Sequence, residues 1–362
     1  MIYLLSKWLL PVFSQANLFR YITFRAALAA GFAILVIVIF GRPVVRRIKR
    51  LGIGEEIYEE LPDTHRKKAG TPTMGGILIV AAVIFSLLLF ADLTNPYVVL
   101  SLIILAGMCV LGFLDDFTKL RKHKRGLKKR WKFLGQSILA LGVSLYLYFF
   151  PESESLRCCT NVLFFKNYVV QMGIFYILFT SFIVVGAGNA VNFADGLDGL
   201  AIGLIAIAAA AFAALAYVAG NVKIAEYLNV LFIPKAGEMA VVCAAVVGAG
   251  LGFLWFNAHP ASIFMGDTGS LPLGALLGFI AIVVKQEILL AIIGGVFVLE
   301  MLSVILQIIW FRASKGQKRL FKKAPLHHHF EMVGWAESKI VVRFWIWGIL
   351  FALAGLATLK VR

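Results

Sequence analysis

The chain has 362 residues, of which 61% are hydrophobic and only 15% are charged, and its formal net charge is +16 at pH 7. Charged residues make up about a quarter of a typical soluble domain, so this composition excludes a soluble globular protein. The positive charge does not require a nucleic-acid partner, because lysine and arginine retained on the cytoplasmic side of a membrane protein explain it. The four cysteines have no spacing typical of a zinc site or a disulfide framework.

Long apolar segments follow one another along the whole chain. A bilayer core about 30 Å thick requires roughly 20 such residues per helix, and the alternation typical of a membrane β-barrel is absent. We therefore expect an all-α, polytopic integral membrane protein with about ten transmembrane helices. The N-terminus has no cationic segment followed by a cleavage site, so no removable signal peptide is expected. The predicted spans are residues 20–41, 72–91, 97–114, 133–150, 170–187, 199–218, 239–256, 270–284, 288–311 and 341–359.

Basic residues cluster in alternate connections between these spans. The connections around 42–71, 115–132 and 312–340 hold most of them, whereas those on the opposite side hold few. Because cytoplasmic loops retain lysine and arginine, we expect these connections to be cytoplasmic and both termini to be periplasmic. No soluble segment and no clear repeat interrupts the pattern, which favours a single transmembrane catalytic domain over 1–362. Its cytoplasmic loops are predicted at about 42–71, 115–132, 188–198, 257–269 and 312–340.

Carboxylates lie at the cytoplasmic ends of the predicted spans. Asp115 and Asp116 stand side by side at the end of the third span, and Asp267 lies in "FMGDTGS" before the eighth. An aspartate inside a span costs about 2.5–3.5 kcal/mol on insertion scales, so several at one depth indicate a function. We expect them to face basic groups from neighbouring loops, an arrangement that suits a polyanion held through a divalent cation.

Further polar motifs lie on the same side. Between the fifth and sixth spans, "NAVNFADGLDGL" spaces Asn192, Asp195 and Asp198 so that they would share one helical face. The remaining motifs are Asn257 in "WFNAHPASIFMGD", the triple histidine in "APLHHHFE" and Lys68 in "HRKKAGTPTMGG".

Each motif also has a purely structural interpretation. The adjacent aspartates could be solvated helix ends, "DGLDG" a turn, and Asp267 a helix cap. The histidines could form a structural metal clamp or an ordinary loop, and the basic runs could be topology signals alone. Glu300, in the middle of the ninth span, is interpreted as structural. The gathering of the other motifs on one side favours a shared functional role.

The ordered set "TPTMGG", "FLDDF", "NAVNFADGLDGL", "GAGLGFLWFN", "FMGDTGSL", "GGVFVLE" and "APLHHHFE" closely resembles the phospho-N-acetylmuramoyl-pentapeptide-transferase family. This family is a branch of the polyprenyl-phosphate N-acetylhexosamine-1-phosphate transferases, and the resemblance covers nearly the whole chain. It implies ten helices in the bacterial inner membrane, with both termini periplasmic and the active site facing the cytoplasm. It also implies that UDP-N-acetylmuramoyl-pentapeptide and undecaprenyl phosphate give lipid I and UMP, with Mg²⁺ required. The triple histidine distinguishes this branch from sister enzymes that use UDP-N-acetylglucosamine.

Phosphoryl transfer between two polyanions depends mostly on positioning and charge neutralisation. We expect Asp267 to be the direct Mg²⁺ ligand, as the resemblance also implies. Lys68 and Lys132 would neutralise the remaining phosphate charge. Asp115 would deprotonate or orient the lipid phosphate, and Asp116 would support the region of the metal and the diphosphate.

Further residues are expected to bind the substrate. Gln307 lies near the cytoplasmic end of the ninth span and could reach the site. Asp198 is assigned to the substrate site with its two neighbours in the same motif. The resemblance implies that Asn192, Asp195, Asn257 and Phe264 line the uridine and sugar pocket. It also implies that His327, to which we assign a catalytic role, and His328 lie near the diphosphate and sugar.

Several alternatives stay open at this stage. Direct attack by the lipid phosphate and a covalent aspartyl intermediate both fit these residues. A secondary transporter is disfavoured, because its coupling acids would lie near the membrane midplane on repeated elements. Membrane lipids are expected partners, and a homodimer is possible. The sequence neither locates the lipid groove nor determines the oligomeric state.

Overall fold

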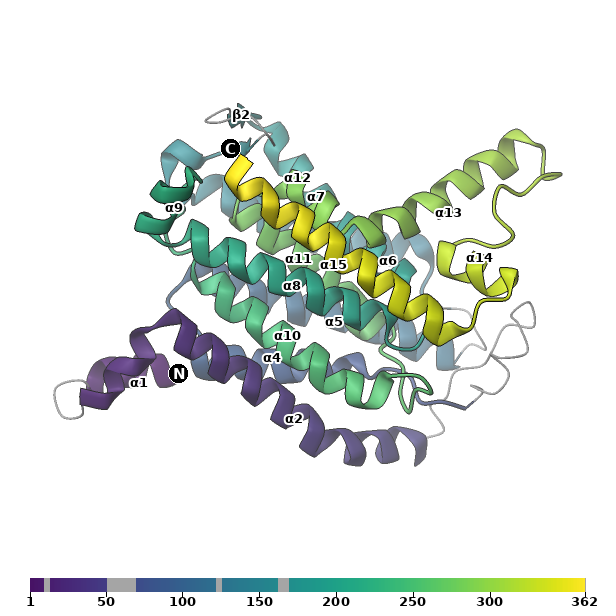
Figure 1. The fold of residues 1–362 in the computed structure, drawn as a ribbon, viewed down its shortest axis with the longest axis horizontal. Helices are drawn as coiled ribbons and strands as arrows, with labels where there is room; N and C mark the ends of the chain where they lie inside the picture. Colours follow the sequence, from purple (N-terminus) through teal and green to yellow (C-terminus); the bar gives the residue numbers. More distant parts are fainter. Residues whose placement is uncertain (10–13, 51–69, 122–125, 162–168, 362) are drawn as a thin grey trace.

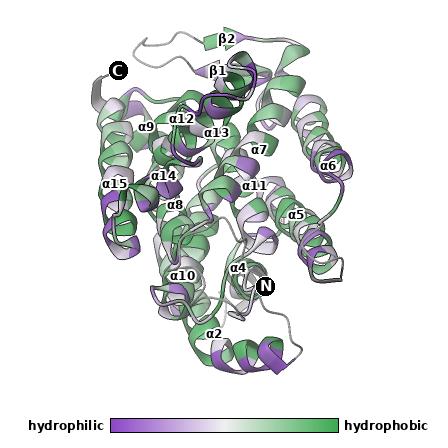
Figure 2. Cartoon of the chain, turned by 90° about the vertical axis from the view of Figure 1, so that its right-hand side faces the viewer, coloured by the Kyte–Doolittle hydropathy of each residue, from purple (hydrophilic) through white to green (hydrophobic). Residues whose placement is uncertain are grey.

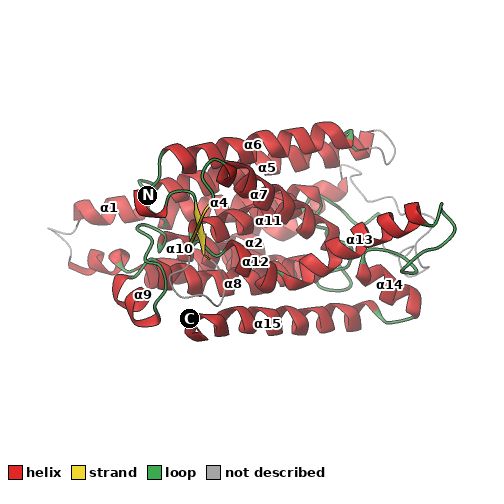
Figure 3. Ribbon diagram, turned by 90° about the horizontal axis from the view of Figure 1, so that it is seen from above, coloured by secondary structure: helices red, strands yellow, loops and turns green. Residues whose placement is uncertain are grey.

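The computed structural model describes residues 1–9, 14–50, 70–121, 126–161 and 169–361. Within these ranges the chain is a bundle of helices with one short two-stranded antiparallel sheet, β1 (Cys159–Asn161) and β2 (Val169–Gln171). Figure 3 shows this helical content at a glance. The all-α prediction is therefore confirmed.

Each predicted span coincides with helical structure. Eight of the described helices are long and apolar enough to cross a membrane, namely α2 (Ile22–Arg50), α5 (Pro96–Arg121), α6 (Lys129–Phe149), α7 (Phe175–Ala194), α8 (Leu200–Ala219), α10 (Glu238–Asn257), α13 (Gly295–Ala313) and α15 (Glu337–Val361). Two shorter apolar helices, α4 (Gly76–Phe90) and α11 (Asp267–Val283), complete the set. Figure 2 shows hydrophobic residues along these helices and hydrophilic residues mainly at their ends. The chain is a multi-pass membrane protein.

Short elements connect the long helices. They are α1 (Ile2–Leu9), η1 (Ser14–Arg20), η2 (Glu154–Leu156), α9 (Val222–Leu228), α12 (Glu287–Ile293) and α14 (Leu326–Val333). The ninth predicted span is wrong as a single helix, because α12 ends at Ile293 and α13 begins at Gly295. The consecutive glycines at this point favour the break, since glycine lowers helix stability.

Several helices continue into segments that were predicted as loops. α5 extends to Arg121, so Asp115 and Asp116 lie inside a helix rather than in a connection. α7 likewise covers most of the predicted loop 188–198. Hydropathy places a boundary where charged residues begin, whereas these two helices continue past that point, so hydropathy alone does not give the ends of the helices.

α11 lies at the centre of the bundle, and all of its residues are buried. It packs against α4, α5, α7 and α8. Close approach depends on glycine: a Cβ at Gly76 would lie 2.1 Å from the backbone nitrogen of Gly269, and one at Gly112 would lie 2.3 Å from the carbonyl oxygen of Asp267. Small residues that permit such contacts are typical of helix packing in membranes. The start of α11 is thereby held against α4 and α5.

The bundle has two distinct ends. Both chain termini and the β1–β2 hairpin lie at one end, which we call the hairpin end, and α14 lies at the other (Figure 1). Asp115, Asp116 and Asp267, which we call the acidic cluster, lie at the end that carries α14, the acidic end. Contacts between Arg25 and Glu238 at one end, and Gly41 and Phe256 at the other, show that α2 and α10 run in parallel.

Candidate active site

The acidic cluster brings together carboxylates from two helices. Asp115 and Asp116 lie on α5, and Asp267 is the first residue of α11. One carboxylate oxygen from each lies within 4.8 Å of the others, and all three residues are buried. Oxygen ligands at this spacing could hold a metal ion, and carboxylates are the ligands that Mg²⁺ prefers.

Two lysines neutralise part of this charge. The Nζ atom of Lys119 lies 3.0 Å from Asp115, 3.2 Å from Asp116 and 2.9 Å from Asp267. The Nζ atom of Lys132, at the start of α6, lies 3.1 Å from Asp115 and also donates to Asp267. Three carboxylates therefore face two ammonium groups, and the side chain of Lys119 remains 41% exposed.

Lys119 is a site residue that sequence analysis missed. It follows Asp115 by four residues and Asp116 by three, and residues at these spacings are neighbours on a helix surface. This signal would have identified Lys119 had α5 been predicted to continue beyond the apolar segment.

Backbone groups fix two of the carboxylates. Asp115 accepts a hydrogen bond from the backbone N–H of Leu127 at 2.7 Å. Asp116 accepts from the backbone N–H of Thr268 at 3.0 Å and from its hydroxyl at 2.7 Å. Asp116 thus satisfies an N-terminal donor of α11, where the helix dipole also favours a negative charge.

The structure corrects the interpretation of Asp267 as a helix cap. The N-cap of α11 is Gly266, which has φ of +71° and provides no side-chain cap. A Cβ at this position would lie 2.7 Å from the carboxylate of Asp116, so only glycine fits. The side chain of Asp267 is consequently free to face the lysines.

Asn192 joins the acidic cluster from α7. Its Nδ2 donates to Asp267 and lies 2.8 Å from the hydroxyl oxygen of Ser270. The expected single helical face for Asn192, Asp195 and Asp198 is wrong, because α7 ends at Ala194 and Asp195 caps it. The turn that follows sends Asp198 toward a different group of residues.

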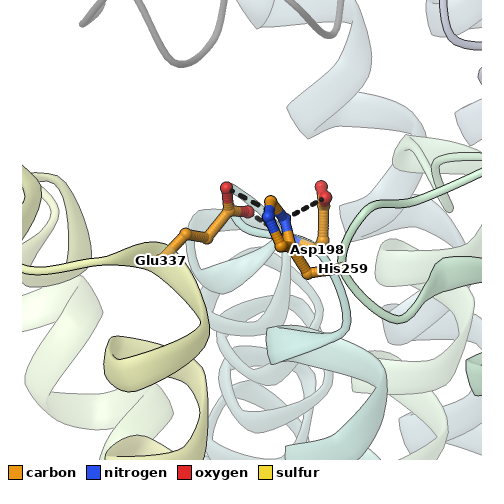
Figure 4. A group of neighbouring side chains, drawn as sticks. All are labelled: Asp198, His259 and Glu337. Carbon is orange, nitrogen blue, oxygen red and sulfur yellow. Dashed lines mark hydrogen bonds and ion pairs between the residues drawn. The ribbon is translucent and has the colours of Figure 1, made fainter.

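Asp198 forms a second polar group with His259 and Glu337 (Figure 4). The Nδ1 atom of His259 lies 3.0 Å from Asp198 and 3.4 Å from Glu337. Asp198 also accepts from the backbone N–H of Ala261 at 3.1 Å, and its own N–H donates to Glu337 at 2.9 Å. These contacts join the start of α8, the loop after α10 and the start of α15.

The triple histidine forms the first turn of α14. His327 is buried, and its Nδ1 lies 3.2 Å from Glu300 of α13, outside hydrogen-bonding geometry. The backbone N–H of His327 donates to Glu300 at 3.2 Å, so Glu300 joins α13 to α14. A Cβ at Gly196 would lie 2.2 Å from Nε2 of His327, which shows how closely α14 approaches the turn before α8.

His328 packs beside Glu331. Its Nδ1 lies 2.7 Å from the Glu331 carboxylate. Burial lowers the pKa of His328 to about 4, although Glu331 acts in the opposite direction. His328 is therefore neutral at pH 7 and interacts as an uncharged imidazole.

Asn257 and Phe264 fix the loop between α10 and α11. Asn257 donates to the carbonyl oxygen of Ile263 at 2.8 Å and accepts from the N–H of Gly199 at 3.0 Å. The backbone N–H of Phe264 donates to Pro72 at 2.8 Å, and its carbonyl oxygen accepts from Gly75 at 2.8 Å. This loop therefore packs on the segment that precedes α4.

Two predicted site residues remain, Gln307 and Lys68. The side-chain oxygen of Gln307 accepts from the backbone N–H groups of Leu320 and Phe321, at 3.0 and 2.9 Å, and so holds the chain that follows α13. Lys68 lies outside the described residues.

Comparisons with known proteins identify relatives over the full chain. The model of glycosyl transferase family 4 matches residues 97–285, and the phospho-N-acetylmuramoyl-pentapeptide-transferase signature 1 matches residues 68–80. The phospho-N-acetylmuramoyl-pentapeptide-transferase of Desulforapulum autotrophicum is 49% identical over 99% of this chain and 100% of its own length. The enzyme of that name from Thermodesulfovibrio yellowstonii is 47% identical over 100% of both chains.

Proposed function

The chain belongs to the phospho-N-acetylmuramoyl-pentapeptide-transferases within glycosyl transferase family 4, and from this membership we propose its reaction. It transfers phospho-N-acetylmuramoyl-pentapeptide from UDP-N-acetylmuramoyl-pentapeptide to undecaprenyl phosphate, and the products are lipid I and UMP. An oxygen of the lipid phosphate forms a bond to the phosphorus that carries the sugar. The bond from that phosphorus to the oxygen of UMP breaks, so no oxidant or reductant is required.

The observation that carries this proposal is the convergence of Asp115, Asp116 and Asp267 with two lysines at one end of a membrane bundle. Two negatively charged substrates repel each other, and their approach requires positioning and charge neutralisation. Lys119 and Lys132 can neutralise phosphate oxygens, because their ammonium groups lie within 3.2 Å of the carboxylates and Lys119 is partly exposed. Lys119 lies on the solvent-exposed side of the cluster, and we expect the phosphates to approach from that side.

Mg²⁺ fits this donor set, since the buried carboxylates offer several oxygens within 4.8 Å of one another. Asp267 would be its principal ligand, with Asp116 in support. One carboxylate oxygen of Asp267 accepts from Lys119 and the other from Asn192, so both oxygens face the polar site. When bound, the ion would supply positive charge next to the diphosphate.

Asp115 is the carboxylate placed to act on the lipid phosphate. One of its oxygens is fixed by Leu127 and the other by the two lysines, so its orientation is set before a substrate binds. From this position it would hold the acceptor phosphate or remove its proton. A covalent intermediate on an aspartate is the alternative course, and trapping a phosphosugar on the protein would identify it.

The second polar region of the acidic end is suited to the nucleotide and the sugar. Asn257 and Phe264 hold the loop beside the start of α8, and an aromatic ring can stack on uracil. His328, neutral at pH 7, would accept or donate a hydrogen bond to the substrate without adding charge. Asp195 and His327 complete the proposed pocket.

The proposed orientation places the acidic end at the cytoplasmic face of the bacterial inner membrane and both termini at the periplasmic face. Basic residues in the connections at the acidic end support it, because such residues are retained in the cytoplasm. A nucleotide substrate made in the cytoplasm could then reach the site directly. The domain would be a single catalytic unit.

The test is product formation by purified protein. Radiolabelled UDP-N-acetylmuramoyl-pentapeptide, undecaprenyl phosphate and Mg²⁺ should give butanol-extractable label, together with UMP. Omission of Mg²⁺, or of the lipid, should abolish the signal. Absence of product in the complete mixture would contradict the proposal.

Two other functions are distinguished by the same assay. Replacement of the donor by UDP-N-acetylglucosamine would give product if the chain were a sister transferase, an outcome that the triple histidine disfavours. A transporter would give no lipid-linked label with either donor, but would move a substrate across sealed vesicles.

A further inference from the structure

An open cavity of about 310 Å³ lies at the acidic end between α2 and α10. Its lining comes from the C-terminal parts of both helices and from the loop after α10. None of these residues belongs to the acidic cluster or has a role in the proposed reaction. The cavity is therefore a feature of its own. The residues that line it are Arg42, Val45, Arg46, Trp255, Phe256 and Ser262.

The six residues that line the cavity include two arginines and no acidic residue. Arg42 and Arg46 are one helical turn apart, so their side chains emerge on the same face of α2. Both are exposed, and neither forms a salt bridge with a residue in the described ranges. Ser262, from the loop after α10, also belongs to the lining and carries a hydroxyl group. Planar guanidinium groups together with a hydroxyl are typical of phosphate recognition.

The position of the cavity corresponds to the membrane surface. Arg42 is the first charged residue after the apolar segment Ala26–Gly41 of α2. Trp255 lies two residues before the end of α10, and 71% of it is exposed. Tryptophan and arginine at helix ends are both typical of the head-group layer. A ligand in this cavity would thus lie at the level of lipid head groups.

We propose that this cavity binds the phosphate head group of an anionic phospholipid in the leaflet that the acidic end faces. Basic pockets between membrane helices on the cytoplasmic side bind such head groups. Undecaprenyl phosphate offers the same chemistry. It is not the occupant that we infer, because the lining of this cavity includes no residue of the acidic cluster, where the acceptor phosphate must react.

Occupancy of the cavity would stabilise the loop after α10. The backbone N–H of Ser262 donates to the carbonyl oxygen of Phe256 at 2.7 Å, and both residues line the cavity. Asn257 lies between them in sequence and ties the same loop to Gly199. A bound head group would therefore favour the loop conformation that presents Asn257 and Phe264. This consequence rests on the proposed function, whereas lipid binding does not.

Native mass spectrometry of the full chain in detergent tests the binding. Phosphatidylglycerol should be retained in preference to phosphatidylcholine, and Arg42→Gln/Arg46→Gln should weaken its retention by roughly fivefold per arginine removed. Arg47→Gln/Arg50→Gln is the matched control, because it removes the same charge from the same helix outside the cavity. Equal losses in both double variants, or no loss in the first, would overturn the proposal.

Transferase assays in vesicles separate the phospholipid from the acceptor substrate. Vesicles that contain phosphatidylglycerol should lower the KM for the nucleotide substrate of the parent chain, relative to vesicles of phosphatidylcholine alone, and Arg42→Gln/Arg46→Gln should lose this effect. A raised KM for undecaprenyl phosphate with unchanged phosphatidylglycerol retention would instead assign the cavity to the substrate. If the parent chain forms no product, the proposed reaction fails, while lipid retention still decides the cavity.

Discussion

Charged side chains are buried at both ends of the bundle, but they are arranged in opposite ways. At the hairpin end, both terminal nitrogens of the Arg25 guanidinium contact the Glu238 carboxylate, one of them at 2.8 Å. The two side chains are only 2% and 10% exposed. Arg25 also donates to the carbonyl oxygen of Phe90, and Glu238 accepts from the N–H of Asp92. The charges of this pair balance, and both side chains are almost completely shielded from solvent.

The acidic cluster is neither balanced nor sealed. Three carboxylates face two lysines, and one of those lysines is partly exposed. A balanced and sealed pair can contribute only to folding, whereas surplus charge beside solvent is available to a charged ligand. The comparison indicates that the two ends should respond differently to removal of one charge.

The largest expected effect follows from Asp267→Asn. This change keeps the shape of the side chain and removes the carboxylate proposed as the principal Mg²⁺ ligand, which also contacts both lysines, so turnover should fall by about a thousandfold or more. The thermal unfolding midpoint in detergent should change little. Near-normal Mg²⁺-dependent turnover in the folded variant would show that the acidic cluster is not the catalytic site.

Glu238→Gln should produce the reverse pattern. It leaves Arg25 buried without its counter-charge, which typically costs about 3–5 kcal/mol of stability. The unfolding midpoint should drop strongly, while the protein that remains folded should keep its turnover per molecule. Arg25→Met/Glu238→Leu is the matched control and should recover much of the stability, because it removes both charges. Loss of turnover without loss of stability would contradict the assignment of the Arg25–Glu238 pair to folding alone.

Lys119→Met tests whether the exposed lysine serves the substrate. Its ammonium group lies within 3.2 Å of every carboxylate in the acidic cluster, so we expect kcat/KM to fall by about a hundredfold. Lys129→Met removes an exposed lysine from the start of α6 and should have little effect. Equal activities of the two variants would argue that Lys119 only balances charge.

His328 offers a smaller effect that depends on pH. Burial lowers its pKa to about 4 from the ordinary value of 6.5, so the unfolded chain binds the proton first as pH falls. Stability is therefore complete above pH 6.5 and is lost progressively toward pH 4, by roughly 1–3 kcal/mol. The unfolding midpoint of the parent chain should fall between these values more than that of His328→Gln. Identical pH profiles would exclude this contribution.

The sequence alone determined the class of the fold and, with the ninth span as the exception, which apolar segments form the long helices. Apolar runs of span length leave the chain no alternative to membrane helices, because the cost of exposing them to water is large. The same reasoning placed polar motifs at one end of the bundle, and the motifs indicated the family that the comparisons then confirmed.

Other features were decided only by the tertiary structure. Helix α5 continues past its apolar segment, which brings Lys119 to the carboxylates. The end of α7 separates Asn192, which joins Asp267, from Asp198, which pairs with His259. Such partners lie far apart in the sequence, and their approach depends on packing between helices, which hydropathy does not encode. Composition fixes which segments leave water, whereas close contacts between backbones fix which side chains meet.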